Sequence, residues 1–141
     1  MKTISLEQSR WRILQVWLAG SIGILLFAIT ICLTRDVRDP QDWTSILGWV
    51  LPHLIPTASL ILSVIGANAM NPHPDPTMVK LVYHRLVLMV LTAYLVAVVT
   101  TFLLEALVPF DLIQTMSIAN LWLGPFQGIV SGVLSVLFFT K

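Results

Sequence analysis

Residues 86–104 read LVLMVLTAYLVAVVTTFLL, a continuous apolar stretch without Asp, Glu, Lys or Arg. A helix rises about 1.5 Å per residue, so roughly 20 such residues cross the apolar core of a bilayer, which is about 30 Å thick. Backbone groups inside lipid have no water to bond, and a helix satisfies them within its own segment. The stretch therefore predicts a transmembrane α-helix, and it decides the class of the fold.

Three further stretches of this kind accompany it. Hydrophobic residues make up 57% of the 141 residues and charged residues 11%, with a mean hydropathy of +0.88, whereas soluble domains carry roughly 25% charged residues. We expect spans at about residues 13–33, 46–69, 86–108 and 118–140. The first is too long for a cleaved signal peptide. The sequence predicts an all-α integral membrane protein, with residues 1–141 as one domain: an antiparallel bundle of four transmembrane helices with short interfacial helices.

Capping signals mark where two of the helices should begin. Residues 5–8 (SLEQ) match the S-x-x-E/Q capping box and predict a helix that starts near Leu6. Asp111 with Gln114 repeats the signal ahead of the fourth span. We expect the second signal to start a short interfacial helix.

Prolines predict further helix starts and bends in the rest of the chain. Residues 39–40 and 75–76 are both Asp-Pro pairs, which suit an N-cap followed by the first helical position. They predict a short interfacial helix ahead of the second span and a third helix that begins near residue 76. Pro52 and Pro56 lie inside the second span and predict a bend or a late start, because each removes a backbone donor. Pro125 leaves the same two alternatives open in the fourth span.

The distribution of Lys and Arg predicts the orientation. The side that carries both termini collects six of the eight basic residues, and the other side has Arg35 and Arg38. Because basic residues concentrate in cytoplasmic segments, we expect a multi-pass protein with both termini in the cytoplasm, in a bacterial inner membrane. The six are Lys2, Arg10, Arg12, Lys80, Arg85 and Lys141.

Small residues recur at a spacing of four. Gly124, Gly128 and Gly132 form a G-x-x-x-G-x-x-x-G ridge, which lets another helix backbone approach closely in lipid. Such a ridge can pack the helices of one chain, or it can join two subunits, and we weigh the first more heavily. Weaker versions of the pattern are Ser59 and Ser63 in the second span and Ala93 and Ala97 in the third.

Four polar residues fall in apolar surroundings. Glu105 is the single acidic residue within an expected span, and it continues the helical face of Ala93 and Ala97. A carboxylate in lipid is costly enough to suggest a function, although Glu105 could also reach the outer headgroups. His53, Asn120 and Gln127 fall in the same half of the expected bundle. We therefore expect a polar cluster there, with Glu105 as a hydrogen-bonding partner.

Several functions are disfavoured. We expect no cofactor and no metal, because His73 and His84 belong to the side opposite His53, and Cys32 has no partner at ligand spacing. No nucleophile elbow, phosphate loop or dinucleotide motif occurs in the sequence, so we expect no enzyme. The net charge of +1 without a basic cluster argues against nucleic acid as a partner.

Three classes of function remain. The foremost is a small non-enzymatic membrane protein that acts by helix packing, as a homo-oligomer or as a subunit with a membrane-protein partner in the lipid bilayer. The alternative is a self-assembling channel or a membrane-permeabilising effector. A small transporter is less favoured, because Glu105 lies near a span end and away from the midplane.

Overall fold

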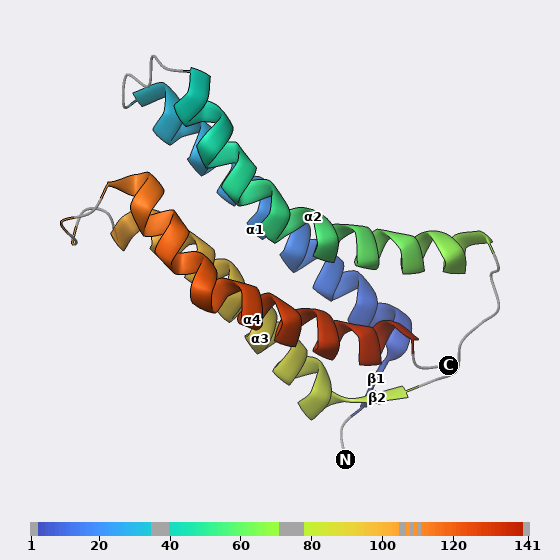
Figure 1. Cartoon of the computed structure of the whole chain (residues 1–141). Helices are drawn as coiled ribbons and strands as arrows, with labels where there is room; N and C mark the ends of the chain where they lie inside the picture. The colour runs from blue at the N-terminus through green and yellow to red at the C-terminus, as the bar shows by residue number, and fades with distance from the viewer. Residues whose placement is uncertain are drawn as a thin grey trace.

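The computed structural model of the chain describes residues 3–34, 40–70, 78–104, 107, 109 and 111–139. Its elements follow the order β1 (Thr3–Ser5), α1 (Leu6–Thr34), α2 (Pro40–Met70), β2 (Met78–Lys80), α3 (Leu81–Leu104) and α4 (Leu112–Phe139), as Figure 1 shows. All four helices are long and apolar enough to cross a membrane. The prediction of a nearly all-helical chain with four membrane-length helices is confirmed.

Three of the predicted helix starts are confirmed. Ser5 Oγ accepts the backbone N–H of Gln8 at 3.3 Å, and α1 begins at Leu6. Asp111 Oδ1 accepts the N–H of Gln114 at 2.7 Å at the start of α4. Pro40 is the first residue of α2. These contacts satisfy backbone donors that the first turn of a helix leaves without a partner.

The prediction of separate short interfacial helices is wrong. The segments ahead of the second and fourth spans belong to α2 and α4, which run without interruption from Pro40 and Leu112. In α2 the hydroxyls of Thr44 and Ser45 both donate to the Gln41 carbonyl, at 2.8 and 2.9 Å. The polar side chains therefore bond within the helix itself, so nothing breaks its first turns.

The third helix also differs from its prediction. Residues Met78–Lys80 form β2, which pairs antiparallel with β1 so that Thr3 lies opposite Lys80. Residues 75–76 lie outside the described residues, and α3 begins at Leu81. The backbone of β2 finds its hydrogen-bonding partners in β1, which a helix starting near residue 76 would forgo. The helix ends at Leu104, before the expected 108, and Leu107 N–H donates to the Leu104 carbonyl in a turn.

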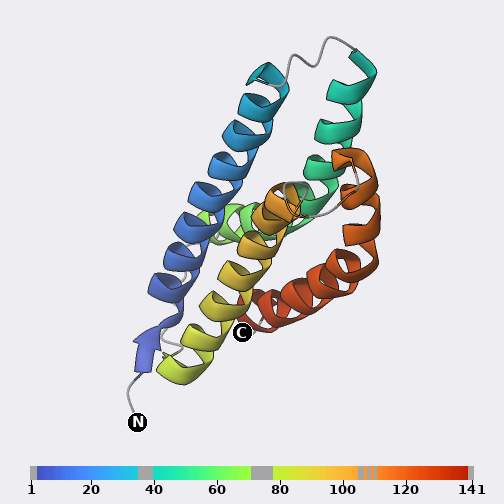
Figure 2. The same cartoon turned by 90° about the vertical axis from the view of Figure 1, so that its left-hand side faces the viewer.

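The helices contact one another in the pairs α3 with α4, α1 with α3, α1 with α2, α2 with α4, and α1 with α4. Figures 1 and 2 show that α2 and α4 both change direction partway along their length. Pro52 and Pro56 lie within α2 and Pro125 within α4. The bend in α2 follows its prediction, and Pro125 is an interior residue of α4, not its start.

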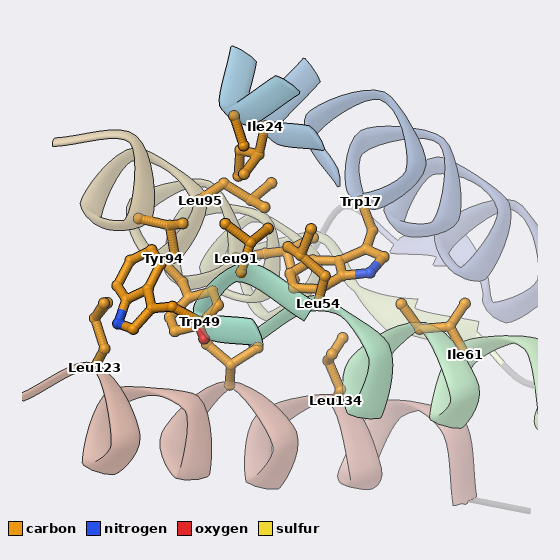
Figure 3. Packing of buried hydrophobic residues seen from close by; sticks show 14 of the residues in the cluster. Trp17, Ile24, Trp49, Leu54, Ile61, Leu91, Tyr94, Leu95, Leu123 and Leu134 are labelled. Carbon is orange, nitrogen blue, oxygen red and sulfur yellow. The ribbon is translucent and has the colours of Figure 1, made fainter. Parts of the chain in front are cut away.

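Large side chains from all four helices meet in the core, as Figure 3 shows. The Trp17 ring of α1 stacks on the Tyr94 ring of α3, with centroids 6.2 Å apart. Phe27 meets the edge of Phe102 at 5.6 Å between the same two helices. Gly20 of α1 lies close to α3: a Cβ at Gly20 would lie 2.5 Å from Leu95 Cδ1, so the Leu95 side chain would have to move to admit it.

Candidate functional site

His53 lies at the centre of the polar residues that the sequence singled out. Its ring is 6% exposed, and it joins α2 to both α3 and α4. His53 Nδ1 lies 3.1 Å from the Tyr94 hydroxyl, and Nε2 lies 3.1 Å from Asn120 Oδ1. The structure thus brings His53 and Asn120 together, although they are far apart in sequence.

The hydrogen bonds around His53 fit a neutral ring. A ring that carries its hydrogen on Nε2 donates to Asn120 Oδ1 and accepts the Tyr94 hydroxyl on Nδ1. The Tyr94 hydroxyl also lies 3.4 Å from the His53 carbonyl oxygen. His53 therefore links α2 to α3 and α4 through both of its ring nitrogens.

Gln127 lies beside this cluster and bonds to the backbone of α2. Its side-chain amide Nε2 donates to the Pro52 carbonyl oxygen at 3.1 Å. In a regular helix that carbonyl would accept the N–H of residue 56, but Pro56 has none. Gln127 supplies the donor that Pro56 lacks, and so it ties the bend in α2 to α4.

Aromatic side chains enclose the His53 ring. The Trp49 ring meets it edge-on with centroids 4.7 Å apart, and Trp49 Nε1 donates to the Met116 carbonyl at 2.9 Å. Tyr94 also contacts Phe126 edge-on at 5.5 Å. Sequence reasoning missed Trp49 and Tyr94 as members of the site. One sequence signal could have found them. A buried Trp N–H or Tyr O–H needs a hydrogen-bonding partner, so polar groups are expected near these two residues.

Glu105, the expected partner of this cluster, lies outside the described residues. Its predicted hydrogen bond with His53, Asn120 or Gln127 stays a prediction. Of these three side chains, His53 is buried, Gln127 is half-buried and Asn120 is exposed. The Asn120 amide therefore bonds inward to His53 and also reaches the surface of α4.

The glycine ridge of α4 faces away from the other described helices. No described atom beyond its own helix lies within 4 Å of a Cβ built at Gly124, Gly128 or Gly132, and all three residues are exposed. The ridge therefore does not pack the described helices of one chain, which was the more heavily weighted of the two interpretations. Contact with another chain stays a prediction. Among the weaker patterns, Ser59, Ser63 and Ala93 are exposed and Ala97 is half-buried.

A second group of polar contacts joins the start of α1 to α3 and α4. The Arg10 guanidinium donates from Nη2 to the carbonyls of Leu137 and Phe138, at 3.3 and 2.8 Å, and lies over the Phe138 ring. Ser9 Oγ lies 2.6 Å from His84 Nδ1. Arg10 and His84 are both buried. The last carbonyls of a helix lack intrahelical donors and attract a cation, which accounts for the position of Arg10.

Among the described residues, no group of three or more His, Cys, Asp or Glu side chains could hold a metal ion.

No family model matches the chain, and neither a curated protein nor a solved structure matches it.

Proposed function

We propose that the chain crosses a bacterial inner membrane four times, as an antiparallel helix bundle with both termini in the cytoplasm. Four helices of membrane length support the insertion, and the excess of Lys and Arg on one side supports the orientation. A reporter fused after Lys141 that folds only in the cytoplasm should be active. Activity of a reporter that works only outside the cytoplasm would show that the termini lie outside, against the proposed orientation.

Within that membrane, the protein acts without catalysing a reaction, by packing against a second copy of itself. The observation that carries this proposal is the open glycine ridge of α4, at Gly124, Gly128 and Gly132. Lipid gives helices no hydrophobic drive to associate, so close backbone approach at small residues supplies the attraction. The ridge has no described neighbour within the chain and therefore offers this surface to another helix. A partner protein in place of the second copy would use the same surface.

Mass measurement of the detergent-solubilised protein tests the proposal. We expect an oligomer for the native chain and a monomer for Gly128→Leu, whose side chain would hold the backbones apart. Gly23→Leu is the matched control, because Gly23 is also an exposed helical glycine with nothing within 4 Å of its Cβ. An oligomer that persists in folded Gly128→Leu would show that the ridge faces lipid. A native monomer that binds a copurifying protein through the ridge would favour the subunit role.

The second candidate function is a self-assembling channel or permeabilising effector. It is favoured by polar side chains on the outer surface of α2 and α4, where Ser59, Ser63 and Asn120 are exposed. In an oligomer such residues could line a water-filled path. It ranks second because the Ser63 hydroxyl already donates to the Leu60 carbonyl of its own helix at 2.9 Å. Release of an entrapped dye from liposomes that contain the protein would favour the channel, and intact liposomes would exclude it.

A further inference from the structure

A pocket of about 330 Å³ lies where β2 and the ends of three helices meet. This volume falls within the range of roughly 300–1,000 Å³ that is typical of ligand pockets. Its lining includes Leu6 of α1, Val79 and Lys80 of β2, Tyr83 of α3, and Val136 and Leu137 of α4. The Tyr83 hydroxyl donates to the Val133 carbonyl at 2.9 Å, which fixes the α3 wall against the α4 wall.

The pocket combines an apolar interior with one charged residue. Leu6 and Leu137 are almost fully buried and form its inner walls. Met78 and Val136 line it as well and are 57% and 56% exposed, so apolar surface continues from the interior to the outside. Lys80 is exposed and is the one charged side chain among the described residues of the lining. An amphiphile with an apolar chain and an anionic head matches this arrangement.

The surroundings of the pocket are also basic. Arg12 of α1 and Arg85 of α3 are both exposed, and both lie within electrostatic reach of His84. Of the described acidic residues, Glu7 belongs to this end, whereas Asp42 and Asp111 lie at the starts of α2 and α4. Charges near a membrane surface attract lipids of the opposite sign. The excess of cations here favours an anionic ligand.

We propose that this pocket binds an acyl chain of an anionic phospholipid, with the headgroup on Lys80. The proposal rests on the membrane insertion proposed above, which places the ends of α1, α3 and α4 at the headgroup level. At that depth the apolar opening at Met78 and Val136 borders lipid tails, and Lys80 borders phosphate. The ligand is thus a lipid of the cytoplasmic leaflet.

Native mass spectrometry of the full chain tests this proposal with two lipids that differ only in their headgroups. We first require resistance to alkaline extraction, which reports insertion itself. The protein is then released from detergent that contains phosphatidylglycerol or phosphatidylcholine with identical acyl chains. We expect phosphatidylglycerol to be retained preferentially. Lys80→Gln should reduce that preference about fivefold, the effect of one basic residue near an anionic surface, and Lys80→Arg should keep it.

A second pair of variants tests whether an acyl chain enters the pocket. Val136→Trp fills the opening and should lower retention of both lipids. Val82→Trp is the control, because Val82 is 78% exposed on α3 and does not line the pocket. Millimolar inorganic phosphate should not displace the lipid, and displacement would reduce the site to a simple anion site. Suppose that the chain resists alkaline extraction, but that it retains both lipids equally and that neither Lys80→Gln nor Val136→Trp changes lipid retention. The lipid proposal is then overturned, while membrane insertion stands. Extraction of the protein at alkaline pH would overturn both the membrane insertion and the lipid proposal that rests on it.

Discussion

The side-chain amide of Gln127 occupies the position of a missing backbone donor: it bonds to the Pro52 carbonyl at 3.1 Å, one helical turn before Pro56. The bond crosses from α4 to α2 and joins the two bent helices. A proline bend in a helix is therefore stabilised here by a side chain from a neighbouring helix, not by the helix itself.

Replacing Gln127 with Leu should destabilise the fold modestly. The change removes the donor to Pro52 and keeps a similar side-chain volume, so we expect a loss of about 0.6 kcal/mol and at most about 1.7 kcal/mol, as for hydrogen bonds between membrane helices. Unfolding in mixed detergent micelles measures it. Gln114→Leu is the control, because Gln114 is exposed and its side chain carries no described contact between helices. Equal effects of the two variants would contradict the assigned role of Gln127.

His53 and Tyr94 should be energetically coupled. Tyr94→Phe keeps the stacking on Trp17 and the contact with Phe126, and removes the hydroxyl that bonds to His53. We expect Tyr94→Phe and His53→Gln each to lower the unfolding free energy by about 1 kcal/mol. The double variant should cost less than the sum, because both changes remove one shared bond. Strict additivity in a double-mutant cycle would show that the two side chains act independently.

Arg10 should matter far more than Arg12. Arg10→Met keeps much of the side-chain length but removes the donor to the Leu137 and Phe138 carbonyls, so we expect a loss of about 1.5–3 kcal/mol, as for bonds from charged groups. Arg12→Met changes an exposed residue and should stay within about 0.5 kcal/mol. Thermal unfolding in detergent compares the two. A tolerated Arg10→Met would mean that the end of α4 holds its place without this cation.

Gly20 and Gly23 should respond differently to the same change. Gly20→Leu forces atoms into the space of Leu95, and overpacking of this kind costs about 1–3 kcal/mol. A Cβ at the exposed Gly23 meets nothing within 4 Å, so Gly23→Leu should be neutral or slightly stabilising through helix propensity. Adding Leu95→Ala to Gly20→Leu should restore part of the lost stability. If Leu95→Ala does not restore stability, the clash of Gly20→Leu is with another residue.

The parts of the fold that depend on neighbouring residues could be predicted from the sequence. The start of α1 at Leu6 and the capping by Asp111 depend on residues three positions apart, so local patterns suffice. The four apolar helices follow from composition and length. The strand Met78–Lys80 could not be predicted this way, because its hydrogen-bonding partner, Thr3–Ser5, is distant in sequence.

The site was predictable only in part, for a related reason. A period of four shows that Gly124, Gly128 and Gly132 share a face, but it does not show what that face meets. Within an apolar run, the ring of Tyr94 looks like any other large core residue, because its hydroxyl becomes informative only beside His53. Gly20 lacks the repeat that marks the ridge, and its close contact with Leu95 depends on how α1 and α3 pack.

The bond between Arg10 and the last turn of α4 has a consequence for biosynthesis. Leu137 and Phe138, which accept the Arg10 guanidinium, follow it by 127 and 128 residues in the chain. During translation the guanidinium is therefore made long before these two acceptors, and a desolvated charge is costly. The contact between the start of α1 and the end of α4 can form only after α4 has been synthesised. A chain truncated before residue 137 would lack both acceptors, and its α1 would be without this contact.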